Sequence, residues 1–241
     1  MSRKIRVLVD GLAEGTQTLD EAASRHLIRV HRLRAGDAFV AVDPVAATWA
    51  EGSVIAAHPR RAEVRLSVVN AAVAPALPPL ILLQCLGKAD KPEQVLRAAT
   101  ALGASEVIFA VAERSIAGPA DERRERWLGI VKDVALQSER GRVPLLHGPE
   151  PLPAALARVS VPVRLVLDPE ATLGMLEALE RDGVDRGCAL LVGPEGGLSA
   201  RELEEARNSG FRPVRLGPHV LRTELAASAA LAVAMAVASR N

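Results

Sequence analysis

The alternation of apolar and polar positions along the chain changes once, near residue 79. Before that point, short apolar runs separated by turn residues predict a small β-rich domain with one helical segment over Asp20–Leu33. The predicted strands of this domain are Val7–Val9, Ala38–Val42, Ser53–Ala56 and Val64–Val68. A stretch rich in Pro and Ala at 74–79 then predicts a linker, so the expected domains are 1–73 and 80–241.

After the linker, apolar runs alternate with longer segments of helical periodicity, which is typical of a mostly parallel sheet with helices on both faces. The predicted strands are Leu80–Leu86, Val107–Val111, Val163–Leu167, Ala189–Val192 and a short one at Val214–Leu216. The predicted helices are Glu93–Leu102, Glu122–Gln137, Glu170–Leu179 and Ala226–Ala238. Asp90 is the expected N-cap of the first helix, and Glu93 its capping-box acid. The expected fold class is therefore α/β.

The composition is globular, with 49% of the 241 residues apolar and 24% charged. Three Phe, two Trp and no Tyr leave almost no aromatic platforms for stacking RNA bases, so any RNA contact must depend on Arg and Lys. The net charge of +1 does not by itself indicate a nucleic-acid-binding protein. A local run of cations nevertheless predicts an RNA-facing patch, for which a solvated face is the alternative. The candidate RNA-binding residues in this run are Arg25, Arg29, Arg32 and Arg34.

The cysteines and histidines indicate neither a disulfide nor a metal site. Cys85 and Cys188 lie far apart inside apolar segments, as buried small hydrophobes of a reduced compartment do. The five His residues show no ligand spacing with acids or cysteines. The first residues lack the apolar segment of a secretory signal, and the apolar stretch Leu225–Ala238 is too short to span a bilayer. We therefore expect a cytoplasmic protein without metal or membrane contact.

The first segment that predicts chemistry is Gly193-Pro194-Glu195-Gly196-Gly197, which follows a buried strand. Glycine tolerates positive φ and lets the backbone approach a ligand closely, and such loops bind the polar parts of cofactors through main-chain groups. Ser199 and Glu202 then form a capping box that begins a helix. The spacing matches neither the phosphate loop nor the dinucleotide fingerprint. A ligand-binding loop and a purely structural turn both remain open at this point.

The second segment runs from Leu216 to Ala226 and places Arg222, Thr223 and Glu224 at the start of an apolar helix. A structural reading assigns Thr223 as the helix cap and Glu224 as the acid that complements the helix dipole. It leaves Arg222 unexplained, because a cation is unfavourable at a helix N-terminus. Arg222 is therefore expected to meet a phosphate or carboxylate. The helix that follows has almost no polar face, so we expect it to be buried or to cover a partner subunit.

Together, the two segments resemble the signature of the RsmE family of 16S ribosomal RNA uridine N3-methyltransferases, in the SPOUT superfamily. In that family a Gly-Pro-Glu-Gly-Gly loop is followed, across one helix, by Leu-Gly-X-X-Ile/Val-Leu-Arg-Thr-Glu-Thr-Ala. The resemblance extends over nearly the whole chain. Further matching segments are His26–Asp37, Lys88–Lys91, Ala98–Gly103, Glu113–Ser115, Gln137–Pro144 and Asp168–Ala171.

The resemblance implies an enzyme that transfers a methyl group from S-adenosyl-L-methionine to N3 of a uridine in 16S ribosomal RNA or the small ribosomal subunit. It also implies a homodimer, an N-terminal PUA-like β-barrel that binds RNA, and a C-terminal α/β domain with a trefoil knot. The implied catalytic residues are Arg222, which holds RNA phosphate or stabilises the developing uracil anion, Glu224, which orients it, and Glu195. The implied cofactor-binding residues are Leu167, Asp168, Gly193, Pro194, Glu195, Gly197, Leu216, Gly217, Val220, Leu221 and Thr223.

Three positions depart from the family pattern. Leu225 stands where Thr is usual, Ala89 where Gly is common and Ala101 where Glu is usual. These departures leave open a catalytically silent RNA-binding or ribosome-assembly protein that kept the fold. A different nucleotide-utilising α/β enzyme is the second alternative, but no lysine lies in or beside the Gly193–Gly197 loop to meet a β- or γ-phosphate.

Overall fold

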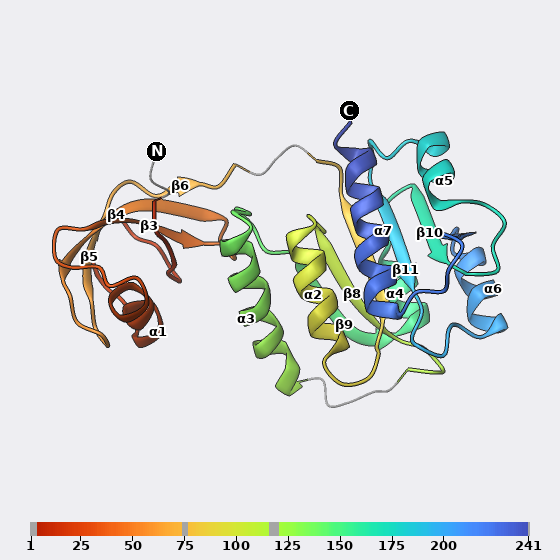
Figure 1. The fold of residues 1–241 in the computed structure, drawn as a ribbon, viewed down its shortest axis with the longest axis horizontal. Helices are drawn as coiled ribbons and strands as arrows, with labels where there is room; N and C mark the ends of the chain where they lie inside the picture. Colours follow the sequence, from red (N-terminus) through yellow and green to blue (C-terminus); the bar gives the residue numbers. More distant parts are fainter. Residues whose placement is uncertain (1–3, 74–76, 116–120, 241) are drawn as a thin grey trace. The chain divides into compact units, whose positions relative to one another are not determined.

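Figure 1 shows the computed structural model, which describes residues 4–73, 77–115 and 121–240. Its contacts divide the chain into an N-terminal unit, which includes the segment Lys132–Val143, and a C-terminal unit with the rest. Residues 74–76 of the predicted linker lie outside the described residues, and the predicted domain limits stay a prediction. We describe the two units separately.

The N-terminal unit is a mixed β-sheet of six strands, as the short apolar runs predicted in outline. Its strands are β1 (Arg6–Leu8), β2 (Gly15–Thr18), β3 (Ala38–Asp43), β4 (Thr48–Ala56), β5 (Glu63–Leu66) and β6 (Asn70–Ala71). The order is β1-β3-β4-β5-β2, with β6 paired to β4; β1 runs parallel to β3, and the other ladders are antiparallel. No ladder joins β1 to β2 within the described residues, so the pairings form an open path, and the PUA-like β-barrel stays a prediction.

One helical segment covers this sheet, as predicted. It consists of α1 (Glu21–Arg25) and the π-helical turn η1 (His26–Val30). The Asp20 carboxylate caps α1 by accepting a bond of 2.7 Å from the Ala23 N–H. Leu27 points into the core, while neighbouring positions of the same turn face solvent. The helical segment ends before the expected Leu33, because the backbone at Arg32 enters the left-handed region with φ 57°.

The C-terminal unit contains a six-stranded sheet in which every neighbouring pair is parallel. Its strands, in spatial order, are β12 (Arg212–Val214), β10 (Val163–Leu167), β11 (Cys188–Val192), β7 (Leu80–Cys85), β8 (Glu106–Val111) and β9 (Leu145–Pro151). The central strands β7 and β11 are buried along their whole length, which explains their continuous apolar sequences. The parallel α/β sheet predicted from the sequence is confirmed.

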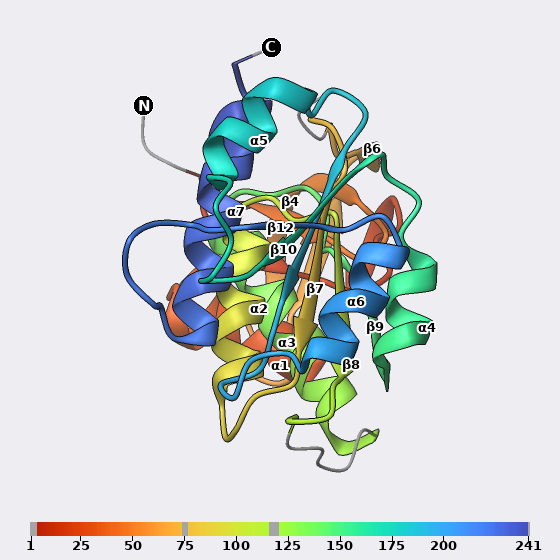
Figure 2. The ribbon, with the colours of Figure 1, turned by 90° about the vertical axis from the view of Figure 1, so that its right-hand side faces the viewer.

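Helices cover both faces of this sheet, as Figure 2 shows. They are α2 (Lys91–Ala101), α4 (Leu152–Arg158), α5 (Met175–Asp182), α6 (Ala200–Asn208) and α7 (Thr223–Ala238), together with the first part of α3 (Asp121–Gln137), whose residues from Lys132 onward belong to the N-terminal unit. On one face α7 packs against β7, β11, α2 and α5; on the other, α4 packs against β8, β9 and α6. No described helix is long and apolar enough to cross a membrane.

Two predicted helix starts were wrong in detail. Asp90 stands at the N-cap position of α2 but makes no side-chain cap bond; its carboxylate accepts from the Gln94 amide, and Glu93 pairs with Arg126. The helix predicted from Glu170 begins at Met175, because the Asp168 carboxylate accepts from the Glu170 N–H and holds a turn there.

Both cysteines are free and buried, as predicted. Burial raises the pKa of the Cys85 thiol, and it raises the pKa of Cys188 to about 12. The part of the chain that the structure describes holds no group of three or more His, Cys, Asp or Glu side chains placed to bind a metal ion.

Candidate functional site

A cavity of about 420 Å³ lies at the carboxyl ends of β10, β11 and β12. Because all three strands are parallel, their following loops meet at one edge of the sheet, where open α/β sheets bind ligands. All eleven residues expected to bind cofactor line this cavity, together with Arg222. The further lining residues are Pro169, Val192, Leu198, Leu203, His219 and Ala226. Glu224 lies outside the lining.

The Gly193–Gly197 loop is held at its C-terminal end by the predicted capping box. The Ser199 hydroxyl accepts from the Glu202 N–H, and the Glu202 carboxylate accepts from the Ser199 N–H. The second Glu202 oxygen accepts a bond of 2.6 Å from the N–H of Glu113, after β8. The buried Glu202 side chain therefore joins the start of α6 to the loop of a different strand.

Arg114 contacts the same loop from outside, which the sequence did not predict. Its guanidinium Nη1 donates a bond of 2.7 Å to the carbonyl of Gly196. A Cβ on Gly196 would lie 3.2 Å from the Arg114 side chain, so the absence of a side chain permits this approach. Arg114 therefore braces the loop at the rim of the cavity.

The loop after β12 lines the cavity with an unusual amount of unpaired backbone. From Leu216 to Leu221, no described protein group bonds a main-chain N–H or C=O. Backbone polar groups of this kind are normally paired, with protein, water or ligand. Gly217 leaves open space where a Cβ would stand. The segment can therefore present both donors and acceptors to a ligand with polar edges.

Thr223 joins two walls of the cavity through a buried network. Its hydroxyl donates a bond of 2.7 Å to the Gly193 carbonyl and accepts one of 2.9 Å from the Gln84 amide. The Gln84 amide also donates to the Cys85 carbonyl. The expectation that Thr223 caps α7 was wrong. Arg222 occupies the N-cap position and makes no side-chain cap bond. The Thr223 hydroxyl instead bonds the Gly193 carbonyl and the Gln84 amide in other segments.

Arg222 is exposed at the cavity rim, and no described carboxylate lies within ion-pair distance of it. It was expected to be oriented by Glu224. Instead, the Glu224 carboxylate lies 3.2 Å from the Lys91 ammonium, which also lies 3.0 Å from the Glu195 carboxylate. The anionic partner expected for Arg222 therefore does not come from the described protein.

The ion pair between Lys91 and Glu195 favours the charged form of both side chains, so their pKa values move in opposite directions. The hydrogen bond to Glu195 is the main reason why the pKa of Lys91 is raised. Burial alone would raise the pKa of Glu195, but bonds from the Lys88 N–H and the Lys91 ammonium outweigh it and lower that pKa. Glu195 is therefore held as a carboxylate. The sequence did not single out Lys91, because its partners lie more than a hundred residues away.

Of the three departures from the family pattern, Ala89 precedes Lys91 and Leu225 follows Glu224, whereas Ala101 lies at the opposite end of α2 from Lys91. Ala89 has φ 54°, in the left-handed region where a non-glycine residue costs about 1–2 kcal/mol. Leu225 is 54% exposed in the first turn of α7, and Ala101 is exposed at the end of α2. Only Ala89 is thus in a conformation that its side chain disfavours.

Replacing Ala89 with Gly is expected to stabilise the protein by about 0.5–1 kcal/mol, since the relief of strain exceeds the added freedom of the unfolded chain. For a protein of this size, thermal unfolding should move upward by roughly 1–4 °C. Ala98→Gly in the middle of α2 is the matched control and should lower stability by about 1 kcal/mol. A fall in melting temperature for Ala89→Gly would contradict the strain argument.

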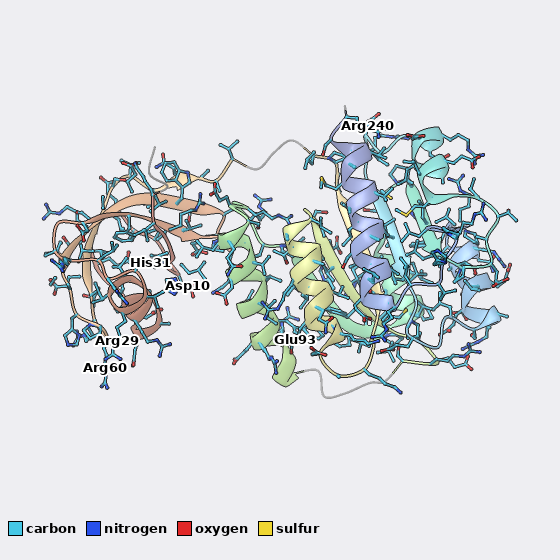
Figure 3. All side chains as sticks on the ribbon, in the orientation of Figure 1. Asp10, Arg29, His31, Arg60, Glu93 and Arg240 are labelled. Carbon is cyan, nitrogen blue, oxygen red and sulfur yellow. The ribbon has the colours of Figure 1, made fainter. Side chains whose placement is uncertain are left out.

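The candidate RNA-binding residues lie on the N-terminal unit. Arg25, Arg29, Arg32 and Arg34 are all exposed, and Figure 3 labels Arg29 on the helical segment of this unit. Arg60 projects from the β4–β5 loop beside it, 3.9 Å from Glu21 at the start of α1. The arrangement is that of an exposed cationic surface, and its role stays a prediction.

Comparison with known proteins identifies the family to which the chain belongs. The family model described as RNA methyltransferase domain matches residues 75–235. The chain is 32% identical to the ribosomal RNA small subunit methyltransferase E of Synechocystis, over 96% of this chain and 77% of that protein. It is 33% identical to the protein of the same name in Mycobacterium bovis, over 89% of this chain and 84% of the relative.

Solved structures agree with these relatives. A putative methyltransferase of Legionella pneumophila in complex with SAM aligns with a TM-score of 0.86 at 27% identity, over 97% of this chain and 98% of that one. The ribosomal RNA small subunit methyltransferase E of Neisseria gonorrhoeae bound to S-adenosyl methionine aligns with a TM-score of 0.83 at 26% identity, over 95% and 96%. The resemblance drawn from the two loop motifs is confirmed, and the chain belongs to the RsmE family of ribosomal RNA small subunit methyltransferases.

Proposed function

We propose that this protein methylates N3 of a uridine in 16S ribosomal RNA and that its methyl donor, S-adenosyl-L-methionine, binds in the cavity at the ends of β10, β11 and β12. One observation carries the proposal: eleven residues chosen from sequence motifs for contact with the donor line a single cavity, beside the Arg222 side chain, which pairs with no residue that the structure describes. Two solved structures of the same fold contain this donor.

The residues present fit the donor. The cavity volume of about 420 Å³ lies in the range of roughly 300–1,000 Å³ that is usual for small-molecule sites. The unpaired backbone of Leu216–Leu221 suits the donors and acceptors of an adenine edge. Asp168 lines the cavity with one carboxylate oxygen engaged by the Glu170 N–H, which leaves the other for a ribose hydroxyl. Gly193 and Gly197 allow close contact with main-chain groups.

The chemistry then requires positioning more than activation. When bound, the donor supplies a methyl group already activated by its sulfonium. Holding the uracil nitrogen at near-attack distance can contribute up to about 7–11 kcal/mol. N3 is normally engaged in base pairing, so the target base must be unpaired or flipped, at a cost of a few kcal/mol. We assign Arg222, which lines the cavity, to holding the RNA phosphate or to stabilising the uracil anion that forms as the N3 proton passes to water.

We assign Glu195 and Glu224 to holding the site rather than to removing the N3 proton. A carboxylate whose pKa is lowered is a weak base, and Glu195 is such a group. Glu224 lies outside the cavity lining, and its described ion pair is with Lys91. Both acids thus act through the geometry of the loops that carry them.

The N-terminal unit is proposed to be a PUA-like domain that positions RNA through phosphates. Neutralising Arg29 and Arg32 together, as Arg→Gln, should weaken RNA binding and reduce the slope of log affinity against log salt by roughly 1.5. Arg181→Gln with Arg240→Gln, which removes two exposed cations from the C-terminal unit, is the matched control. An unchanged salt slope in a filter-binding titration would show that the cationic surface is an ordinary solvated face that does not contact RNA.

We further propose that the protein forms a homodimer and that its C-terminal domain is knotted. Along α7, one face is buried against the sheet, whereas apolar positions on its other side are only half-buried, as expected of a surface that a second copy covers. Sedimentation of the purified protein at several concentrations tests the dimer. The knot rests on membership of the family, and a loop-threading test by circular permutation at the β12–α7 connection would examine it.

Two measurements test the proposed function. Calorimetry of the purified protein should detect binding of S-adenosyl-L-methionine with one site per chain. Incubation with 16S ribosomal RNA or small subunits should then yield N3-methyluridine at one mapped position. If the protein binds the donor but yields no methylated nucleoside, its substrate is not the ribosomal RNA tested. No affinity for the donor would support the silent RNA-binding protein instead.

A further inference from the structure

Lys91 connects two segments that the chain places far from it. Its ammonium lies 3.0 Å from the Glu195 carboxylate, in the loop after β11, and 3.2 Å from the Glu224 carboxylate, in the first turn of α7. We propose that Lys91 is a positioning residue that holds these two walls of the donor cavity together. The inference rests on the proposed function and adds a residue that touches neither donor nor RNA.

The three side chains are sheltered enough for the interaction to matter. Lys91, Glu195 and Glu224 are 22%, 28% and 17% exposed, respectively. Exposed ion pairs contribute little, whereas pairs removed from solvent are screened less. Both carboxylates approach one nitrogen, so they are also close to each other. Without the ammonium their like charges would repel, and the two segments would separate.

The position of Lys91 in its own helix supports the same conclusion. Lys91 is the first residue of α2, where the helix dipole disfavours a cation. Two carboxylates from other segments compensate for this unfavourable placement. The chain thus places a locally unfavourable charge where a tertiary contact requires it.

The loop before α2 is shaped around Glu195. The Lys88 N–H donates a bond of 3.0 Å to the same carboxylate oxygen that pairs with Lys91. A Cβ on Gly87 would lie 3.0 Å from that carboxylate, so a larger residue at this position would require the Glu195 side chain to shift. The segment 87–91 therefore contacts the Glu195 carboxylate through the Lys88 N–H and the Lys91 ammonium. The Lys91 ammonium also pairs with Glu224.

Lys91 itself does not line the cavity, while Glu195 does. Its effect on donor binding must therefore pass through the two acids. The Gly193–Gly197 loop is also tied to α7 by the Thr223 hydroxyl, which bonds the carbonyl of Gly193, two residues before Glu195. The ion pairs and this hydroxyl together hold the loop at two points, so that loss of Lys91 should loosen one side of the cavity.

Lys91→Met, which keeps length and removes charge, should raise the dissociation constant for S-adenosyl-L-methionine by roughly tenfold, as expected for the loss of two sheltered ion pairs. Lys91→Arg should restore most of the affinity, since it keeps the charge. Lys88→Met is the matched control, because only its backbone contacts Glu195; it should bind the donor like the wild type. The KM for RNA should change much less than the KM for the donor.

A double-mutant cycle separates positioning from a direct role. In a Glu195→Gln, Glu224→Gln background, Lys91→Met should change donor affinity by less than about twofold, because its partners are gone. The triple variant carries no unpaired carboxylate, so it serves as a folded form if Lys91→Met alone fails to fold.

Two results would overturn the inference: donor affinity of Lys91→Met within twofold of the wild type, or an equally large effect in the background without the acids. A wild-type protein that binds no donor is a different outcome, which refutes the proposed function itself.

Discussion

Replacing Arg222 with Ala is expected to lower the turnover number for methyl transfer by roughly a hundredfold or more, while donor affinity changes by less than about twofold. The guanidinium lies at the rim of the cavity and has no ion-pair partner among the described residues, so its loss opens no hole in the structure. Removal of a single preorganised group that stabilises developing charge commonly costs about 10²–10³ in rate.

The same substitution should leave stability unchanged or slightly raise it, because Arg222 is a cation at the N-terminus of α7. A fall in turnover without a fall in stability would therefore show that the substitution removes function and leaves the fold intact. Single-turnover kinetics, calorimetry with the donor and thermal unfolding measure the three quantities. Arg222→Lys should retain part of the rate, and Arg240→Ala, an exposed arginine of the same unit paired with Glu180, is the control. Unchanged turnover for Arg222→Ala would end its assignment to the reaction.

Replacing Thr223 with Val should produce the largest loss of stability among the changes considered, roughly 2–4 kcal/mol. The hydroxyl is buried and bonds both the Gly193 carbonyl and the Gln84 amide. Val has nearly the same shape, so the effect comes from the Gly193 carbonyl, which loses its partner, and from the Gln84 amide, which keeps its bond to the Cys85 carbonyl but loses its second acceptor; each loss costs about 1–3 kcal/mol. Because one of them belongs to the Gly193–Gly197 loop, donor affinity should fall as well.

Chemical denaturation of Thr223→Val and calorimetry with the donor measure these two effects. Ser228→Ala is the matched control: its hydroxyl bonds the Glu224 carbonyl within the same helix and joins no second segment. That variant should change stability by less than about 1 kcal/mol. A stable Thr223→Val protein with unchanged donor affinity would show that the network does not hold the cavity.

Elements with strong local periodicity were predicted closely. The strand Val163–Leu167 has the predicted bounds, and the capping box of Ser199 and Glu202 is present as expected. These features depend on neighbours within a few residues, so the sequence contains the whole of the signal. The residues that line the cavity were implied by the family resemblance, and the parallel strands bring the three loops that carry them to one edge of the sheet.

Elements with weak local signals were missed. The strand β9 (Leu145–Pro151) contains Gly, two Pro and His, and it belongs to the sheet only because β8 pairs with it. The helix α4 (Leu152–Arg158) has just seven residues and is stabilised by packing on β8 and β9. Tertiary contact overrides propensity in both places.

The order of apolar and polar residues alone established an α/β chain with glycine-rich loops at the ends of its parallel strands and an unbalanced arginine before its last helix. Those properties come from contacts within a helical turn or a strand. The partners of Lys91, Thr223 and Arg114 came only from the folded chain: each contacts a loop between about 30 and 130 residues away. Short-range patterns carry no information about such pairs, because it is the sheet order that brings these distant loops together.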